Sequence, residues 1–277
     1  MGLRVEDASY EYATGSKLPM PALVRVSLCV EPGSLVLVVG ETGSGKSTLL
    51  RLAAGLLAPS AGSVVLDGEP LSRRAARGVI GLVFQDPESQ LFAETVLQDA
   101  AFGPSNLGLG KQEALEQAAE ALERVGLDPE SYGARSPFHL SGGEARRAAI
   151  AGVLAMRPRY LLFDEPTAGL DARGRRAVAD IIAEERKRSG IVVVSHSAEE
   201  FFDHADEVVM LADGEVVFRG APSSLIAQPQ AFARSGLVAP DVLRLIARGR
   251  ERGAALVPET LGTADVAAAI ARSGGWA

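Results

Sequence analysis

Residues 40–48 carry the residue types of a loop that binds phosphate groups. The segment reads Gly-Glu-Thr-Gly-Ser-Gly-Lys-Ser-Thr and fits the pattern G-x-x-x-x-G-K-[ST]. Its glycines let backbone N–H groups turn inward around phosphates, and a helix that starts there adds partial positive charge. We expect Lys46 to neutralise the β- and γ-phosphates of a nucleotide, and the Ser47 hydroxyl to hold Mg²⁺. The predicted nucleotide contacts of this loop are Gly40, Glu41, Thr42, Gly43, Ser44, Gly45, Lys46, Ser47 and Thr48.

A second glycine-rich turn lies at residues 140–144, which read Leu-Ser-Gly-Gly-Glu. A Ser-Gly-Gly turn that opens a helix offers another surface that can grip a phosphate. Two such surfaces in one chain are difficult to explain if each molecule works alone. We therefore predict that Ser141, Gly142, Gly143 and Glu144 contact a nucleotide held by a neighbouring subunit.

Two acids follow a short apolar run. Residues 160–163 predict a buried strand, and Asp164 and Glu165 stand at its carboxyl end, where α/β sheets place their ligands. Asp164 can hold Mg²⁺ through its water shell, and Glu165 can polarise the water that attacks the γ-phosphate. An Asp-Glu pair at a strand end is common on protein surfaces, but an upstream phosphate loop favours the catalytic interpretation.

Two ring side chains can also face the nucleotide. His196 follows an apolar strand predicted for residues 191–195. A histidine there is often structural, but the end of this strand points at the expected nucleotide, so we predict a contact with the γ-phosphate. Tyr12 lies on a strand upstream of the phosphate loop and can stack on an adenine ring. An ordinary strand aromatic is an equally good interpretation of Tyr12 from spacing alone.

The elements that must position these residues alternate between strands and helices. Residues 34–39 predict a buried parallel strand, and residues 49–56 predict a helix that ends near a glycine. This order of strand, loop and helix is the context that the phosphate loop needs. Further strands are predicted for residues 62–68 and 78–84, and further helices for residues 111–126, 144–156 and 263–271.

Bulk composition limits the partners and the location. The net charge of −7 and the pI of about 5.2 argue against nucleic acid as a partner. The one cysteine, Cys29, excludes an internal disulfide framework and fits a reducing compartment. No apolar run approaches the roughly 18 residues of a spanning helix, and the first residues lack a signal-peptide pattern. We expect a cytoplasmic protein that docks on a membrane machinery rather than crossing the bilayer.

Six motifs in a fixed order together resemble the ATP-binding cassette (ABC) ATPases over about residues 3–220. They are the phosphate loop, Gln85, residues 140–144, Asp164 with Glu165, residues 169–171 and His196. The resemblance implies an α/β fold, in which a P-loop NTPase core carries an antiparallel β subdomain and a helical subdomain at about residues 88–156. It also implies ATP and Mg²⁺ as cofactors, and two ATPase subunits that close face to face over two nucleotides.

The resemblance assigns further roles to single residues. Tyr12 looks like the adenine-stacking aromatic, and Gln85 like the residue that links Mg²⁺ and the attacking water to a membrane partner. Asp171 looks like the loop residue that meets the opposite subunit. The catalytic residues implied are Glu165, His196 and Gln85, and the metal ligands implied are Ser47, Gln85 and Asp164.

A finer resemblance covers residues 81–92, 95–109 and 146–158. Their Pro-Glu-x-Gln-Leu-Phe and Phe-Gly-Pro-x-Asn-Leu-Gly pieces are similar to the ATPases of energy-coupling factor (ECF) transporters, which import vitamins, cobalt or nickel. This implies a transmembrane coupling protein that docks after Gln85, a separate substrate-binding membrane protein, and a place at the cytoplasmic face of the membrane. The second ATPase subunit is either identical or a paralogue. A conventional ABC importer is the alternative.

Other classes fit the sequence less well. ABC ATPases of DNA repair insert a long coiled coil between the phosphate loop and residues 140–144, and this interval is too short for one. Translation factors carry two cassettes in one chain, whereas a second P-loop is absent from this sequence. A P-loop small-molecule kinase would not need residues 140–144.

Two regions depart from the ABC pattern or extend beyond it. Glu144 stands where the family usually has Gln, and a carboxylate near a nucleotide adds repulsion, so we expect its contact to differ or to lie on the ribose side. Residues 221–277 form a C-terminal extension. It either helps to hold two ATPase subunits together, as in ECF ATPases, or covers an edge of the core.

Overall fold

The computed structural model describes residues 2–13, 20–196, 199–252 and 263–272. Among these residues, one sheet has the strand order β10-β9-β3-β8-β7-β6 and a second, antiparallel sheet has the order β2-β1-β4-β5. The larger sheet consists of β3 (Leu35–Val39), β6 (Ile80–Val83), β7 (Tyr160–Asp164), β8 (Gly190–Ser195), β9 (Glu207–Ala212) and β10 (Glu215–Gly220). The smaller sheet consists of β1 (Leu3–Tyr12), β2 (Met20–Val30), β4 (Ala61–Leu66) and β5 (Glu69–Pro70).

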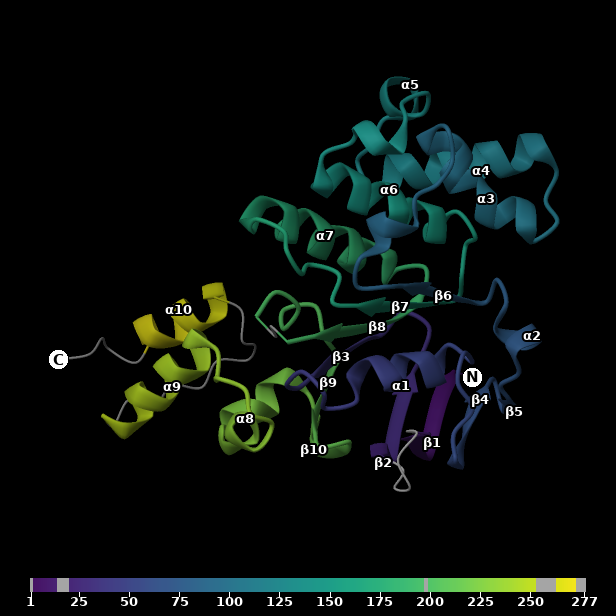
Figure 1. Cartoon of the computed structure of the whole chain (residues 1–277). Helices are drawn as coiled ribbons and strands as arrows, with labels where there is room; N and C mark the ends of the chain where they lie inside the picture. The colour runs from purple at the N-terminus through teal and green to yellow at the C-terminus, as the bar shows by residue number, and fades with distance from the viewer. Residues whose placement is uncertain (1, 14–19, 197–198, 253–262, 273–277) are drawn as a thin grey trace.

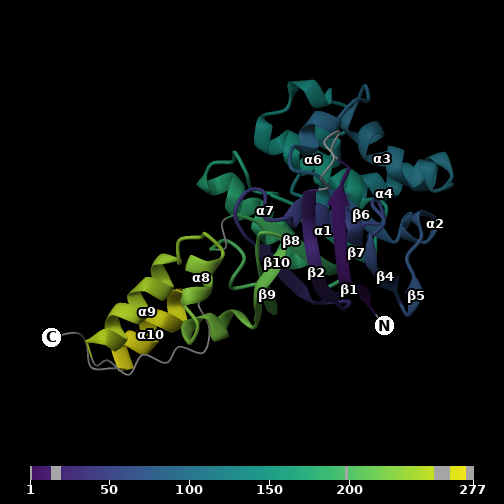
Figure 2. The same cartoon turned by 60° about the horizontal axis from the view of Figure 1, so that its bottom comes forward.

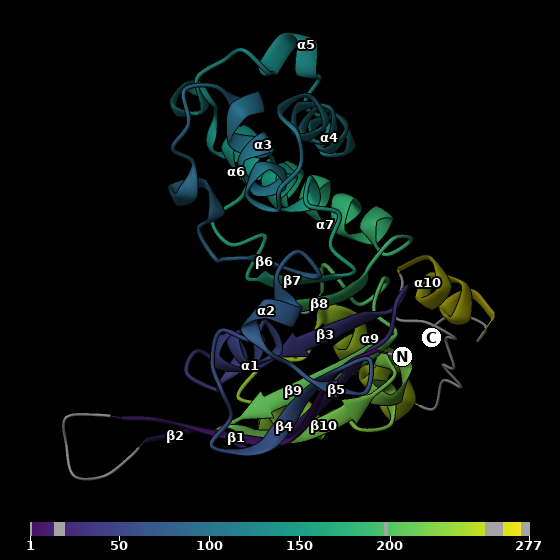
Figure 3. The same ribbon diagram turned by 90° about the vertical axis from the view of Figure 1, so that its right-hand side faces the viewer.

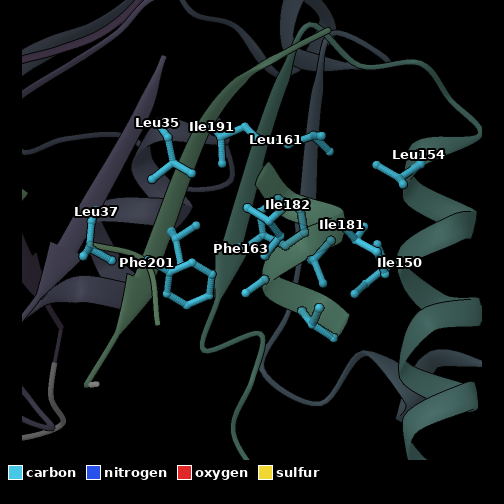
Figure 4. Packing of buried hydrophobic residues seen from close by; sticks show 14 of the residues in the cluster. Leu35, Leu37, Ile150, Leu154, Leu161, Phe163, Ile181, Ile182, Ile191 and Phe201 are labelled. Atoms are coloured by element: carbon cyan, nitrogen blue, oxygen red, sulfur yellow. The ribbon is translucent and has the colours of Figure 1, made fainter. Parts of the chain in front are cut away.

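The larger sheet is buried on both faces. Strand β3 pairs in parallel with β8 and β9, while β10 closes one edge in the antiparallel sense. Successive side chains of β3 alternate between two apolar cores, with Leu35 and Leu37 in one and Val36 in the other. Figure 4 shows the first core, in which Leu35 and neighbouring side chains of the sheet face Ile182 of α7 (Ala172–Glu185). Burial of both faces explains why these strands read as continuous apolar runs.

The second core lies between the two sheets. Helix α1 (Lys46–Ala53) contributes buried leucines to it, and the smaller sheet contributes Val5 and Leu28. The paired strands β1 and β2 run out to one side of the molecule in Figure 3. The short helix α2 (Arg73–Ala76) follows β5. This arrangement places the start of α1 beside the smaller sheet.

Helices α3 to α6 form a lobe over the other face of the larger sheet (Figure 1). They are α3 (Val96–Asn106), α4 (Lys111–Arg124), α5 (Pro129–Tyr132) and α6 (Gly142–Leu154), with the 3-10 turns η1 (Pro87–Gln90) and η2 (Pro137–His139). Helices α4 and α6 correspond to the predicted helices 111–126 and 144–156. Helix α3 was not predicted, because Gly103 and Pro104 break its pattern; both lie in its last turns.

The chain ends in small helices that lie on the β10 side of the larger sheet, away from the helical lobe (Figure 2). They are η3 (Pro222–Ile226), α8 (Gln230–Arg234), α9 (Asp241–Glu251) and α10 (Thr263–Arg272), the last matching the helix predicted at residues 263–271. Residues 253–262 and 273–277 of the expected C-terminal extension lie outside the described residues. Within the described part, no helix is both long and apolar enough to cross a bilayer.

Candidate functional site

The P-loop (residues 40–48) connects β3 to α1 and borders a pocket of about 560 Å³, the P-loop pocket. Residues from distant parts of the chain meet there: Tyr12, Thr42, Gly43, Gly45, Lys46, Ser47, Thr48, Gln85, Glu165 and His196. The structure therefore brings together most of the residues predicted to bind or cleave the nucleotide. Met20, Pro21 and Ala22 at the start of β2 complete the lining, and the sequence had not indicated them.

The backbone of the P-loop leaves the start of α1 open. Gly45 precedes the helix with φ of 101°, and a Cβ atom there would come within 2.5 Å of the carbonyl oxygen of Ala22. Only glycine avoids both the strain and the collision. No side chain of the described residues caps α1, and its first turn holds no acid. Its N-terminal backbone N–H groups are therefore available to an anion, which the helix dipole favours.

Lys46 points back along the loop. Its Nζ atom donates hydrogen bonds to the carbonyl oxygens of Gly40, at 2.7 Å, and Glu41, at 2.8 Å. Burial lowers the pKa of Lys46, although the charges of Glu165 and Asp164 oppose the shift. Within the described residues, the hydroxyl of Ser44 is buried without a hydrogen-bond partner. A buried cation and an unpaired donor beside open N–H groups fit the polyphosphate of a nucleotide.

Ser47 and Asp164 meet at the end of β7. The Ser47 hydroxyl donates to Oδ1 of Asp164 at 3.0 Å, and burial raises the pKa of this carboxyl group. The pair offers two oxygen ligands, the type that Mg²⁺ prefers. No group of three or more His, Cys, Asp or Glu side chains in the described chain could hold a metal by itself. These residues therefore fit a Mg²⁺ ion that is bound together with nucleotide phosphates rather than by a protein cage.

Glu165 and His196 form a direct pair at the edge of the P-loop pocket. Nδ1 of His196 lies 2.6 Å from Oε2 of Glu165, and the His196 backbone N–H donates to the same oxygen at 3.2 Å. Glu165 has a φ of 49°, a left-handed conformation uncommon for residues other than glycine. Such strain gathers at functional sites.

Tyr12 lies beside the P-loop, and its hydroxyl is 3.2 Å from the hydroxyl of Thr48. Its ring packs edge-on against Tyr10 with the ring centres 5.0 Å apart. Tyr12 therefore lines the pocket at a place where an adenine ring could stack. The adenine-stacking interpretation of Tyr12 requires this position. Glu41 lies apart from the P-loop pocket and borders a neighbouring one of about 660 Å³.

The Ser-Gly-Gly turn (residues 140–144) lies in a different pocket of about 980 Å³, the turn pocket. Ser141, Gly142, Gly143 and Glu144 line it together with Gly169, Leu170 and Asp171. The carboxylate of Asp171 caps α7 by accepting a hydrogen bond from Gly174 N–H at 2.7 Å. None of these residues borders the P-loop pocket. The predicted nucleotide contacts thus fall into two separate groups on one chain.

Glu144 turns toward Ser141. Its Oε2 accepts hydrogen bonds from the Ser141 N–H, at 2.8 Å, and hydroxyl, at 2.7 Å, and its Oε1 accepts one from the Tyr132 hydroxyl at 2.8 Å. The Ser141 hydroxyl oxygen in turn accepts a hydrogen bond from the Glu144 N–H at 3.4 Å, and the two interactions form a capping box. Donation from the Ser141 hydroxyl and backbone, then from Tyr132, lowers the pKa of Glu144 to about 2. A carboxylate of the same chain therefore occupies this helix start.

Sequence reasoning missed Tyr132, Glu88 and Arg146. Arg146 lies on the buried face of α6, one turn before Ile150, and forms an ion pair with Glu88. A charged residue on an apolar helical face was the available signal, since such a charge requires a buried partner. The sequence did not reveal which partner it has.

Comparisons with known proteins agree with this geometry. A family model described as "ABC transporter" matches residues 23–168. The energy-coupling factor transporter ATP-binding protein EcfA2 of Symbiobacterium thermophilum is 44% identical over 276 residues, which cover 98% of this chain and 96% of that protein. The protein of the same name from Caldanaerobacter subterraneus is 40% identical over 268 residues, with 94% and 93% covered.

Two solved structures are similar as well. CbiO1 of Clostridium perfringens, described as part of the ABC transporter complex CbiONQ, has a TM-score of 0.74 and 32% identity, covering 88% of this chain and 98% of that one. An ATP-binding cassette solved as a dimer in a post-hydrolysis state with ADP and Pi has a TM-score of 0.70 and 27% identity, covering 79% of this chain and 98% of that one.

Proposed function

The chain belongs to the ABC transporter ATPases, among the ATP-binding proteins of energy-coupling factor transporters, and we propose that it powers a vitamin or transition-metal importer. It is an ATPase of this family, with the predicted α/β P-loop fold. In the proposal it works at the cytoplasmic face of the membrane with a second ATPase subunit, a transmembrane coupling protein and a substrate-binding membrane protein. The second subunit is either another copy of this chain or a paralogue.

The separation of the two pockets is the observation that carries the proposal. The P-loop pocket offers a cation, open N–H groups and the Glu165–His196 pair, whereas the turn pocket offers the start of a second helix. Neither pocket of one chain holds both sets. In the proposal, the Ser-Gly-Gly turn of one subunit caps the γ-phosphate of a nucleotide in the P-loop pocket of the other. The dimeric cassette with ADP and Pi supports such an arrangement.

The polar side chains at and beside the P-loop pocket have distinct roles in this mechanism. Lys46 leaves the carbonyls of Gly40 and Glu41 and binds the β- and γ-phosphates. Mg²⁺ held by Ser47, Asp164 and Gln85 would neutralise phosphate charge. Glu165 orients and polarises the attacking water, and His196 holds Glu165 in place and senses the γ-phosphate. Closure of the dimer depends on that phosphate, so its loss opens the dimer.

An apolar groove in the helical lobe is evidence for the proposed membrane partner. The groove, of about 390 Å³, is lined by residues of β6, of the segment after Gln85, of α3 and of α6. Phe92 and Phe102 stand at it, 58% and 49% exposed, with ring centres 4.8 Å apart. Exposed aromatic side chains of this kind mark interaction surfaces. We assign this docking groove to a helix of the transmembrane coupling protein.

The domain division is part of the proposal. Residues 1–220 would form the ATPase domain, with the helical subdomain at about residues 88–156. Residues 221–277 would form an extension that helps to join the two ATPase subunits. Within the described part of this extension, α8 packs on β9 and β10, α9 packs on η3 and α10 packs on α9. Leu237 and Pro240 line the same pocket as Glu41 of the P-loop. This position supports a link between the extension and nucleotide binding.

The experiment that tests the ATPase mechanism uses Glu165→Gln. This change removes the carboxylate that polarises water but keeps its shape. We expect turnover to fall by at least about a hundredfold, the loss typical of one transition-state group. ATP binding and a closed dimer should persist, as measured by nucleotide retention and sedimentation. Hydrolysis near the wild-type rate would refute the role of Glu165.

The transport proposal is tested by isolating the tagged chain from its native membrane. We expect a transmembrane protein and a second ATPase subunit to co-purify, and mass spectrometry identifies them and any bound small molecule. A double variant with Asp in place of Phe92 and Phe102 should lose the membrane protein but keep the ATPase partner. Recovery only with ribosomes or DNA would contradict the proposal.

A further inference from the structure

Arg146 is a buried cation at the centre of the helical lobe's contact with the core. It lies in the second turn of α6, and only 3% of its surface is exposed. A guanidinium this deeply buried must have its N–H groups paired. Its partners come from two segments. One borders the docking groove, and the other follows the catalytic carboxylate.

The first partner of Arg146 is Glu88 in η1, three residues after Gln85. Nε donates to Oε2 of Glu88 at 3.1 Å, and a terminal nitrogen donates to Oε1 at 2.9 Å, which makes a bidentate pair. Burial acts to raise the pKa of Glu88, but the hydrogen bond from Arg146, a backbone hydrogen bond and the charge of Arg146 together outweigh burial, so the pKa is lowered. The neighbours of Glu88 in this turn, Pro87 and Gln90, line the docking groove.

The second set of partners lies in the loop that follows the catalytic carboxylate. The other terminal nitrogen of Arg146 donates to the carbonyl oxygens of Pro166, at 3.2 Å, and Ala168, at 2.5 Å. This loop begins at Glu165, with its left-handed backbone, and leads to Asp171 in the turn pocket. One planar side chain therefore fixes the end of the docking groove relative to the loop between the two pockets.

We propose that Arg146 is a positioning residue that transmits movement of the docking groove to the loop at residues 165–171. The inference rests on the proposed function, because it requires a membrane partner in the groove. A shift of Glu88 moves the guanidinium, which carries the Pro166 and Ala168 carbonyls with it, since the fork geometry of arginine is rigid. Glu165 and the turn-pocket residue Asp171 then move together. Neither Arg146 nor Glu88 touches the nucleotide in this account.

The test compares ATP hydrolysis by the isolated ATPase subunits with hydrolysis by the complete membrane complex. The ratio of the two rates is the stimulation by the membrane partner. Glu88→Gln is the main variant, because Glu88 is partly exposed and its loss leaves Arg146 its carbonyl partners. Arg146→Lys is the second variant, since lysine keeps the charge but cannot bridge both partners. Arg219→Gln is the matched control: it breaks another bidentate pair, with Glu207, between β10 and β9.

We expect both variants to lower the stimulation about twofold to thirtyfold, the range for changes within a coupling network. Both variants should match the Arg219→Gln control in KM for ATP, in melting temperature and in subunit composition. Wild-type stimulation in Glu88→Gln and Arg146→Lys would overturn the inference alone. Loss of the membrane partner from the Glu88→Gln complex would also overturn it, because Glu88 would then be a docking contact. If no membrane partner co-purifies with the wild-type chain, the proposed function is refuted, and this inference, which depends on it, is refuted as well.

Discussion

The P-loop and the Ser-Gly-Gly turn both place glycines at the start of a helix, yet they use that helix start differently. At α1, no acid stands in the first turn and no described side chain caps the backbone N–H groups. At α6, Ser141 and Glu144 form a capping box, and Tyr132 holds the carboxylate from the other side. The first helix start is open to a phosphate, whereas the second already holds an anion of its own chain.

This difference suggests different tasks for the two regions. The P-loop pocket is prepared to bind a nucleotide in a single subunit. In the proposed mechanism, the turn pocket exchanges the Ser141–Glu144 hydrogen bond for a contact with a phosphate, so it engages only when a nucleotide arrives on a partner. The comparison predicts that changes in the P-loop alter binding, whereas changes in the turn alter closure and turnover.

The largest effect should come from Lys46→Ala. Lys46 is the buried cation of the P-loop pocket, so its loss removes the charge that phosphates require. We expect ATP binding to be lost and hydrolysis to fall by more than about a hundredfold. Calorimetric titration with ATP and a phosphate-release assay measure both. Lys187→Ala, which breaks only an exposed pair with Glu184, serves as the control. Intact binding would refute the P-loop assignment.

Ser141→Ala should separate binding from turnover. Without the hydroxyl, the turn loses a donor to the γ-phosphate on the partner, and we expect the maximal rate to fall about a hundredfold. The ATP affinity of the isolated chain should not change, because Ser141 does not border the P-loop pocket. Ser136→Ala in the same lobe is the control. A parallel loss of affinity would show that the two pockets are not distinct in function.

Glu144→Gln should have a smaller effect of the opposite sign. The change removes a negative charge beside the expected phosphate and weakens the hold on Ser141. Two charges about 4 Å apart repel by roughly 1 kcal/mol in water, so closure should need about fivefold less ATP. The ATP concentration needed for closure is measured by sedimentation at increasing ATP, with Glu144→Gln added to the Glu165→Gln variant. High salt should reduce the difference between the proteins with and without the Glu144→Gln change. Tyr132→Phe, which keeps the charge, should change closure less. Weaker closure in Glu144→Gln would contradict this account.

The smallest effect concerns stability and pH. The pKa of Glu144 is lowered from its ordinary value of 4.5 to about 2 in the folded chain. A lowered folded pKa means that Glu144 stabilises the fold fully above pH about 4.5 and loses this contribution as the pH falls toward 2. The difference in unfolding free energy between wild type and Glu144→Gln should be constant from pH 6 to 8 and shrink between pH 4 and 3. Denaturant titration checks this, and a constant difference down to pH 3 would exclude the ionised cap.

Much of the fold could be predicted from the sequence because its signals are local. Buried strands such as residues 35–39 read as apolar runs, and the P-loop pattern fixes a strand, a loop and a helix. The α/β P-loop fold and the family were predicted correctly on these grounds. The roles of the individual site residues stay predictions, although the structure brings most of them to one pocket.

The contacts between distant segments could not be predicted. Arg146, Glu88 and the carbonyl of Ala168 are far apart in sequence, and only the packing of the lobe on the core brings them together. Glu144 is different, because Ser-x-x-Glu before a helix is a capping box that can be read directly. The expectation that its nucleotide contact differs or lies on the ribose side considered only its charge and stays a prediction; in this chain the carboxylate turns to Ser141.

The central claim is that Ser141 of one subunit meets the nucleotide held by the P-loop of another. Ultraviolet light cleaves a protein backbone beside bound orthovanadate, so the complex purified from its membrane can be irradiated with ATP, Mg²⁺ and vanadate. The account predicts cleavage of this chain near residues 42–47 and also near residues 141–143, the second only in the closed dimer. Because the two segments line separate pockets of one chain, the second cut requires a neighbour. Cleavage at the P-loop alone would contradict the account.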